Sequence, residues 1–300
     1  MTLIKYRKVT YIISSVLLLL SVLALSFWGL KLGIDFTGGS LLEVEYKTSR
    51  PTLEELNKLL DTAGFQSAVV QPTGERGVLV RTGHLAEDDH QRLVLALRGN
   101  EPDSLIEKQF DTIGPTIGKE LARKSVYAIL LVILLIVLYI AWAFRHVSEP
   151  VSSWKYGIAT VIALVHDVLI PVGAFSVLGH FFGIEADTLF VTALLTILGF
   201  SVHDTIVVFD RIRENLKNAQ GRKPFEDVVG ESIGQTITRS INTSMTVLLV
   251  LLAIFFFGGE SARYFSLALI IGIAFGTYSS ICLASPILVS WHKWSSGRRK

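Results

Sequence analysis

Charged residues are few in this chain, and their scarcity argues against a soluble globular fold. They make up 18% of its 300 residues, whereas 50% are hydrophobic and the mean hydropathy is +0.50. Soluble domains carry about 25% charged residues, because they need more polar surface than this composition supplies. The sequence therefore predicts an integral membrane protein.

Cysteine is nearly absent. The sequence has one, Cys282, so an intrachain disulfide is excluded. The net charge is only +2, which gives no basis for nucleic-acid binding. The polar segment 31–123 contains neither a His/Cys metal cluster nor the spacing of a nucleophile and its base. We therefore expect a protein that is not an enzyme and needs no metal or other cofactor.

Long apolar runs dominate the rest of the sequence. Six of them approach or exceed the roughly 20 residues that a helix needs to cross a bilayer. They are 9–30, 126–144, 156–178, 188–209, 241–257 and 264–291. The first has a basic start like a signal peptide, but its apolar core is longer than a signal core, so we expect an uncleaved anchor.

Basic residues set the predicted orientation. They gather at the N-terminus, after the second and fourth runs, and in the tail, as Lys5, Arg7, Lys8, Arg145, Lys155, Arg211, Arg213, Lys217, Arg222, Lys223, Lys293, Arg298, Arg299 and Lys300. The positive-inside rule places both termini in the cytoplasm and 31–123 outside. We divide the chain into the N-terminus with the first span (1–30), an outer domain (31–123), spans two to six (124–292) and a basic tail (293–300).

The outer segment has the pattern of a small α+β domain. Strands are predicted at 41–46, 66–71, 77–81 and 104–110, and helices at 52–60 and 87–98. The first helix should begin at Thr52 with a Thr52/Glu55 capping box and turn Leu53, Leu56, Leu59 and Leu60 inward. A turn is expected at 72–76, and 114–121 is either a linker or a coupling element. The order βαββαβ is the ferredoxin-like pattern, typical here of a docking or force-transmitting module.

Acids inside the apolar runs are the strongest functional candidates. A carboxylate at bilayer depth costs a few kcal/mol or more and normally faces a bundle interior or a water path. Asp204 lies in the fourth run, flanked by Ser201 and Thr205. We interpret Asp204 as a titrating carrier site, with a purely structural buried carboxyl group as the alternative.

Asp167, in the third run, is the second such acid. Pro171 follows four residues later and cannot donate to the carbonyl of residue 167, so a kink with a free acceptor is expected there. The pattern indicates a hydrated path or hinge. A protonated Asp bonded to a neighbouring helix is the alternative.

Three basic side chains accompany these acids. Arg239, at the start of the fifth run, is either the counter-ion of Asp204 or an ordinary interfacial anchor. His166 and His203 each precede an acid, but adjacent helical residues point about 100° apart. Each histidine therefore need not touch its own Asp, and a packed, hydrogen-bonded histidine is the expected role, with proton relay as the alternative.

Small residues recur at intervals of four in the last run, as Ala268, Gly272, Gly276 and Ser280. Such a stripe lets two helix backbones approach closely. It predicts tight helix packing against either another helix of this chain or one of another subunit.

Five motifs point to one family. They are Gly33-Ile-Asp-Phe-Thr-Gly-Gly39, Ala163-Leu-Val-His-Asp167, Gly199-Phe-Ser-Val-His-Asp-Thr-Ile-Val-Val-Phe-Asp-Arg-Ile-Arg-Glu-Asn215, Arg239-Ser-Ile-Asn-Thr-Ser244 and Phe257-Gly-Gly259. On these motifs the chain resembles, over essentially its whole length, the SecF family of the bacterial SecDF protein-export complex, within the RND superfamily.

The resemblance implies a fold and a setting. The fold is an RND-type half, an all-α bundle of six membrane helices with one extramembrane α+β ferredoxin-like domain (βαββαβ) between helices 1 and 2. The setting is the bacterial inner membrane, with the outer domain in the periplasm. The implied partners are a SecD-like subunit, the SecYEG channel, translocating preproteins and YajC.

The resemblance also implies a mechanism in which the proton gradient assists preprotein export. The proton relay maps to Asp204, Arg239 and Asp167, with His203, His166, Ser201 and Thr205 as candidate modulators. The coupling ion is a proton or, as in some relatives, sodium. One departure is His203, which stands where the family usually has Asn, so a titratable group here could shift the working pH range.

Other functions are less well supported by the sequence. An exporter of lipid or small molecules from the same superfamily fits poorly with six spans and one modest outer domain. A non-transporting membrane scaffold would make the charges of Asp204 and Arg239 dispensable. An intramembrane aspartyl protease using Asp167 and Asp204 would need a Gly-x-Gly-Asp motif, whereas Ser201-Val-His203 precedes Asp204.

Overall fold

The computed structural model describes residues 2–99, 103–144 and 152–297, so Arg145 and the basic residues at 298–300 lie outside the described part. The chain divides into two compact units. One is Met1–Lys31 together with Tyr127–Lys300, and the other is Leu32–Val126. The division falls inside the second long helix rather than at residue 123, because that helix starts within the outer unit.

Six helices of the described chain are long and apolar enough to cross a membrane, as the hydropathy predicts. After the short α1 (Thr2–Lys5) they are α2 (Arg7–Trp28), α6 (Pro115–Ala143), α7 (Ser153–Phe182), α8 (Thr188–Ala219), α9 (Phe225–Phe257), and α10 (Glu260–Ser279) with its continuations. The continuations are a π-helical turn, η1 (Ser280–Ala284), and α11 (Ser285–Gly297). α7 runs on past Pro171, and the kink there stays a prediction.

The fourth and fifth helices are longer than their apolar runs. α8 continues to Ala219 and α9 begins at Phe225, well before residue 241. Hydropathy detects only the lipid-embedded part of a helix. The polar turns that extend each helix form the same backbone hydrogen bonds but do not raise the hydropathy. The sequence analysis therefore predicted the end of α8 and the start of α9 too close to their apolar runs.

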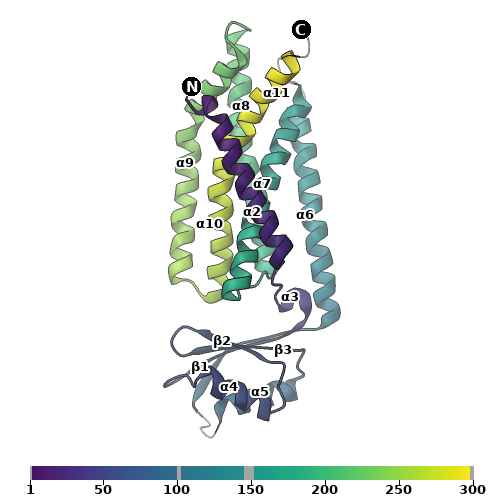
Figure 1. Ribbon diagram of the computed structural model, residues 1–300, viewed down its shortest axis with the longest axis vertical. Coiled ribbons are helices and arrows are strands. Elements are labelled where there is room, and N and C mark those ends of the chain that lie inside the picture. The colour runs from purple at the N-terminus through teal and green to yellow at the C-terminus, as the bar shows by residue number, and fades with distance from the viewer. Residues whose placement is uncertain (1, 100–102, 145–151, 298–300) are drawn as a thin grey trace. The chain divides into compact units, whose positions relative to one another are not determined.

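Packing in the helical unit depends on small residues. α2 lies along α7 (Figure 1), and at their contact Ser176 Oγ is 2.9 Å from the carbonyl oxygen of Ala24 and a Cβ on Gly173 would overlap Ser21. α1 and α11 lie at the same end of this unit. There Glu226 of α9 accepts from Arg7 at 2.7 Å and pairs with Lys293 of α11.

The outer unit is a four-stranded antiparallel sheet with two principal helices. Its elements are α3 (Ile34–Thr37), β1 (Gly39–Tyr46), α4 (Leu53–Thr62), β2 (Val69–Thr73), β3 (Gly77–Thr82), α5 (Glu87–Arg98) and β4 (Leu105–Ile113). The strand order is β2-β3-β1-β4. Alternate residues of β1, such as Leu42 and Val44, are fully buried against Leu56 and Leu93 from the helices.

Of the local predictions for this unit, the capping box of α4 is confirmed and the burial of two of its leucines is wrong. The capping box is confirmed, since the Thr52 hydroxyl accepts from Glu55 N and the Glu55 carboxylate accepts from Thr52 N at 2.8 Å. The backbone N–H and the hydroxyl of Thr52 both donate to the Glu55 carboxylate, and they lower the pKa of Glu55 because they favour its ionised form. Leu53 and Leu59 were wrongly placed inward and are 41% and 37% exposed, because α4 buries only the face of Leu56 and Leu60.

The predicted 72–76 turn is shorter than expected, because Pro72 belongs to β2 and pairs with Val78. β2 is an edge strand, where a residue without an N–H is tolerated. The 114–121 segment is also not an irregular linker. α6 begins at Pro115, a first-turn position that suits proline.

A glycine contact joins α6 to the start of the sheet within the outer unit. Gly38 has φ +76°, and a Cβ on Gly118 would lie 2.8 Å from the Gly38 nitrogen and 3.1 Å from the Phe36 oxygen. These are backbone atoms, which cannot move aside as a side-chain tip can. Gly38 and Gly118 therefore set how closely α6 meets the start of β1.

Gly118→Ala is expected to lower the stability of the outer unit by about 1 kcal/mol, because the new methyl group overlaps backbone. Amide hydrogen exchange of β1 and β4 in the full chain in nanodiscs measures it. Gly114→Ala is the matched control, since nothing lies within 4 Å of its Cβ position. Equal protection in both variants would contradict the close contact.

Candidate functional site

Two buried acids occupy the interior of the helical unit. Asp167 of α7 is 0% exposed and Asp204 of α8 is 7% exposed. They form separate centres, because each is held by different helices. α8 serves both, with Ser201 facing the first centre and Asp204 forming the second.

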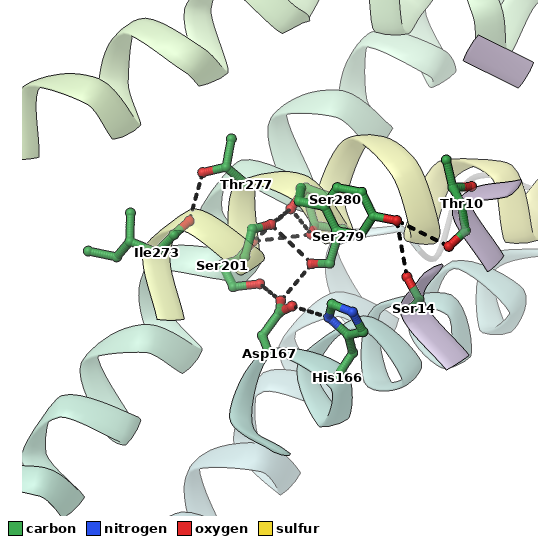
Figure 2. A network of polar contacts seen from close by, with 12 residues as sticks. Thr10, Ser14, His166, Asp167, Ser201, Ile273, Thr277, Ser279 and Ser280 are labelled. Atoms are coloured by element: carbon green, nitrogen blue, oxygen red, sulfur yellow. Dashed lines mark hydrogen bonds and ion pairs between the residues drawn. The ribbon is translucent and has the colours of Figure 1, made fainter. Parts of the chain in front are cut away.

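The Asp167 carboxylate joins three helices (Figure 2). Its Oδ2 accepts from Ser201 Oγ of α8 at 2.5 Å and from Ser279 Oγ of α10 at 2.7 Å. Its Oδ1 lies 2.9 Å from Nδ1 of His166, the preceding residue on α7. All four side chains are fully or almost fully buried. The carboxylate is therefore well supplied with hydrogen-bond partners.

The same network extends toward α2. The His166 ring stacks on Tyr278 with centroids 6.0 Å apart. The Tyr278 hydroxyl donates to the Thr10 carbonyl at 3.1 Å and accepts from Ser14 at 3.3 Å (Figure 2). Directly after Tyr278 and Ser279 the helix changes to the π-helical turn η1, a local widening found often at functional sites.

Asp204 has a sparser environment. Its Oδ1 accepts from Ser240 Oγ of α9 at 2.5 Å. Its Oδ2 is buried and has no hydrogen-bond partner among the described residues. A buried carboxylate oxygen without a partner carries the desolvation cost of that atom. The two oxygens of Asp204 therefore differ, with Oδ1 hydrogen-bonded and Oδ2 left without a donor among the described residues.

The structure brings α9 to Asp204, but through Ser240 rather than through Arg239. The side chain of Arg239 is exposed, and in the described part of the chain no ion pair joins it to Asp204. Adjacent helical positions diverge by about 100°, so only one of the two can face α8 at a time. Arg239 and His203 are nevertheless close enough for a charge on either side chain to act electrostatically on Asp204.

The two histidines differ. His166 does touch its own Asp, whereas His203 is exposed on the surface of the isolated unit. Of the hydroxyls beside Asp204, Ser201 bonds to Asp167, and Thr205 Oγ1 lies 2.8 Å from Ser280 Oγ. Among the described residues, neither hydroxyl forms a hydrogen bond with Asp204 itself.

The small-residue stripe of α10 lies against α8. A Cβ on Gly272 would overlap Ile197, and one on Gly276 would lie 3.1 Å from Ser201 Cβ. Ser280 meets Thr205, and Ala268 is fully buried. The close approach positions Ser279 to reach Asp167.

Sequence reasoning missed Ser240, Ser279 and Tyr278. Ser240 directly follows Arg239 in a motif already singled out, and Ser279 directly precedes the stripe residue Ser280. The available signal was a small hydroxyl residue in an apolar helix, which often bonds across helices. That signal does not say which neighbour receives the bond, so the pairing needed the structure.

Comparison with known proteins defines the class. The family profile described as "Protein export membrane protein SecD/SecF, C-terminal" matches residues 95–294, and the "SecD/SecF GG Motif" matches residues 24–49. A crystal structure of SecDF from Thermus thermophilus, described as a translocon-associated membrane protein, superposes with a TM-score of 0.84 at 34% identity. This chain is 98% covered and spans 39% of that longer chain.

Individual relatives narrow the class further. Two are named "Protein translocase subunit SecF". The one from Thermobaculum terrenum is 44% identical, covering 96% of this chain and 93% of its own. The one from Anaerolinea thermophila is 41% identical, covering 95% and 92%. The chain is a protein-export membrane protein by class, and within that class it belongs to the SecF family of translocase subunits.

Proposed function

We propose that this chain is the subunit of an ion-gradient-driven complex that assists preprotein export through a SecYEG-type channel. Asp204 is its proton-carrying group, and the chain performs no enzymatic reaction. The observation that carries the proposal is the buried Asp204 side chain, which has one hydroxyl donor and one unpartnered oxygen. Protonation of a buried carboxyl group in that state removes a charge that has few partners.

The chemistry follows from two neighbouring positions on α9. With Ser240 against Asp204, a neutral donor faces the carboxyl group, and a proton on Oδ2 removes the cost of a buried charge. A turn of α9 by about 100° would bring Arg239 to that place instead. A guanidinium there favours the ionised carboxylate, so the proton leaves. Alternating the two partners alternates uptake and release.

A SecD-like subunit is the proposed partner. The solved SecDF chain is longer than this chain, which matches 39% of it. In the isolated unit His203, Arg239 and Asn242 are exposed near the middle of α8 and α9. Polar groups at bilayer depth normally face protein or water rather than lipid. A second helical bundle on this face would cover them.

The outer unit is proposed to be a ferredoxin-like domain on the periplasmic side of the bacterial inner membrane. Its chain order βαββαβ and sheet order β2-β3-β1-β4 support that fold. The basic residues near both termini support a cytoplasmic location for those ends. Movement of this domain would transmit the proton cycle to the preprotein.

Reconstitution tests the proposal. The chain, its SecD-like partner and the translocation channel are placed in vesicles, and the protease-protected fraction of a preprotein is measured with and without a proton gradient. We expect the chain to co-purify with the partner and to increase protection only when the gradient is present. Equal protection with and without the gradient, or without the chain, would refute the proposal. A sodium gradient in place of the proton gradient identifies the coupling ion.

A further inference from the structure

His166 has a feature that the Asp204 relay does not use. Its side chain is fully buried between α7 and α10, and its Nε2 has no hydrogen-bond partner among the described residues (Figure 2). Its other nitrogen, Nδ1, faces Asp167 Oδ1 at 2.9 Å. A buried ring nitrogen without a partner either carries a proton that has no acceptor or offers a free lone pair.

The surroundings of Asp167 decide between these states. Ser201 and Ser279 both place hydroxyl groups on Oδ2, at 2.5 and 2.7 Å. Complete burial opposes ionisation of Asp167, but these two hydroxyl donors and the imidazole beside Oδ1 favour it, and we take the donors to prevail. An ionised Oδ1 accepts only, so the nitrogen 2.9 Å away must carry the proton. His166 then has Nδ1–H, and its Nε2 is an unprotonated base.

We propose that the His166–Asp167 pair is a second proton-binding site, in which Nε2 of His166 takes the proton and Asp167 stays ionised. Asp167 acts as a positioning residue, because it fixes the tautomer and balances the charge of the imidazolium. One proton bonds to the Nε2 lone pair, and the same proton leaves when the site discharges. No other bond changes.

The pair is shielded from other charges. From α10 it faces the rings of Phe275 and Tyr278 and the hydroxyl of Ser279. From α8 it faces Ser201, while Asp204 points to Ser240 of α9. The Tyr278 hydroxyl is engaged with Thr10 and Ser14 of α2. Among these described neighbours Tyr278 is the titratable one, so the counter-charge of an imidazolium is Asp167.

This second site deepens the proposed transport function. Proton binding at His166 does not depend on that function, and only the role of the site in transport rests on it. α8 contributes Ser201 to this site and Asp204 to the other, three residues apart on one helix. Displacement of α8 would therefore change the partners of both sites together. The protonation state of His166 itself can be measured without any transport.

Nitrogen-15 NMR of histidine-labelled protein in lipid, with the SecD-like partner bound, tests the site. His166→Gln identifies the His166 signals among those of seven histidines. We expect the Nδ1–H tautomer at high pH and protonation of Nε2 as the pH falls. Asp167→Asn should switch the tautomer to Nε2–H, because the amide can donate to Nδ1. His180→Gln, at an exposed position of α7, should leave the His166 signals unchanged.

The outcomes separate the two claims. An Nε2–H tautomer in the unmodified protein, or His166 signals that do not change between about pH 5 and pH 9, overturns the second site and leaves the Asp204 relay standing. If Nε2 titrates as expected but gradient-driven export retains its full pH profile in His166→Gln, the site binds a proton without a role in transport. A shifted or flattened profile in His166→Gln, with His180→Gln unchanged, supports that role.

Discussion

Asp204→Asn is expected to reduce gradient-dependent export to the level seen without a gradient. The amide keeps the size of the side chain and can still accept from Ser240, but it can neither lose nor gain a proton. The helices that bury Asp204 should therefore still assemble. Protection of a preprotein in reconstituted vesicles, compared with and without the gradient, measures the loss.

Asp210→Asn is the matched control on the same helix. Asp210 is exposed and lies 3.8 Å from Arg213, a surface pair that contributes about 0–1 kcal/mol. Export in this variant should keep its full gradient dependence. Gradient-driven export by Asp204→Asn at the normal rate would rule out Asp204 as the carrier, whereas equal loss in both variants would indicate a general charge effect.

Gly173→Ala is expected to give the largest loss of stability. A Cβ on Gly173 would lie 2.5 Å from the Cα of Ser21, so α2 and α7 cannot keep their present separation. Moving a helix backbone aside also weakens the bonds of Ser176 to the end of α2. We expect a loss of about 3 kcal/mol, the upper part of the range for overpacked sites.

Thermal unfolding of the full chain in nanodiscs measures this loss. Gly157→Ala is the control on the same helix, because nothing lies within 4 Å of its Cβ position. That variant should unfold at the same temperature as the parent or at a slightly higher one, since alanine favours the helix more than glycine does. A Gly173→Ala protein as stable as Gly157→Ala would show that α2 and α7 are not in contact at Ser21.

Much of the architecture could be predicted because it depends on solvent preference. Long apolar runs indicated six membrane helices, and alternating residues indicated the strands of the outer unit. Thr52 and Glu55 fixed the start of α4, since a capping box is a local pattern. Properties decided by residues near one another in the chain were therefore accessible from the sequence.

The partners within the site were not accessible in the same way. Arg239 and Ser240 are neighbours in sequence, and the positive charge of Arg239 suggests it as the partner of Asp204. The rotation of α9 instead turns Ser240 toward Asp204. Likewise Ser201 stands three residues from Asp204 yet bonds to Asp167. Such choices depend on the rotation of one helix against another, which is set by contacts between residues far apart in the sequence, such as those of Gly272 and Gly276 with α8.

Infrared difference spectroscopy of the reconstituted complex can show whether Asp204 gains and loses a proton. A protonated carboxyl group has a carbonyl band separate from that of a carboxylate, so its loss or gain can be followed as the gradient is applied. If Asp204 is the carrier, we expect a carboxyl band that changes with the gradient, shifts with carbon-13 labelling of aspartate and is missing in Asp204→Asn. A spectrum in which Asp204→Asn leaves every gradient-dependent carboxyl band in place would contradict that role.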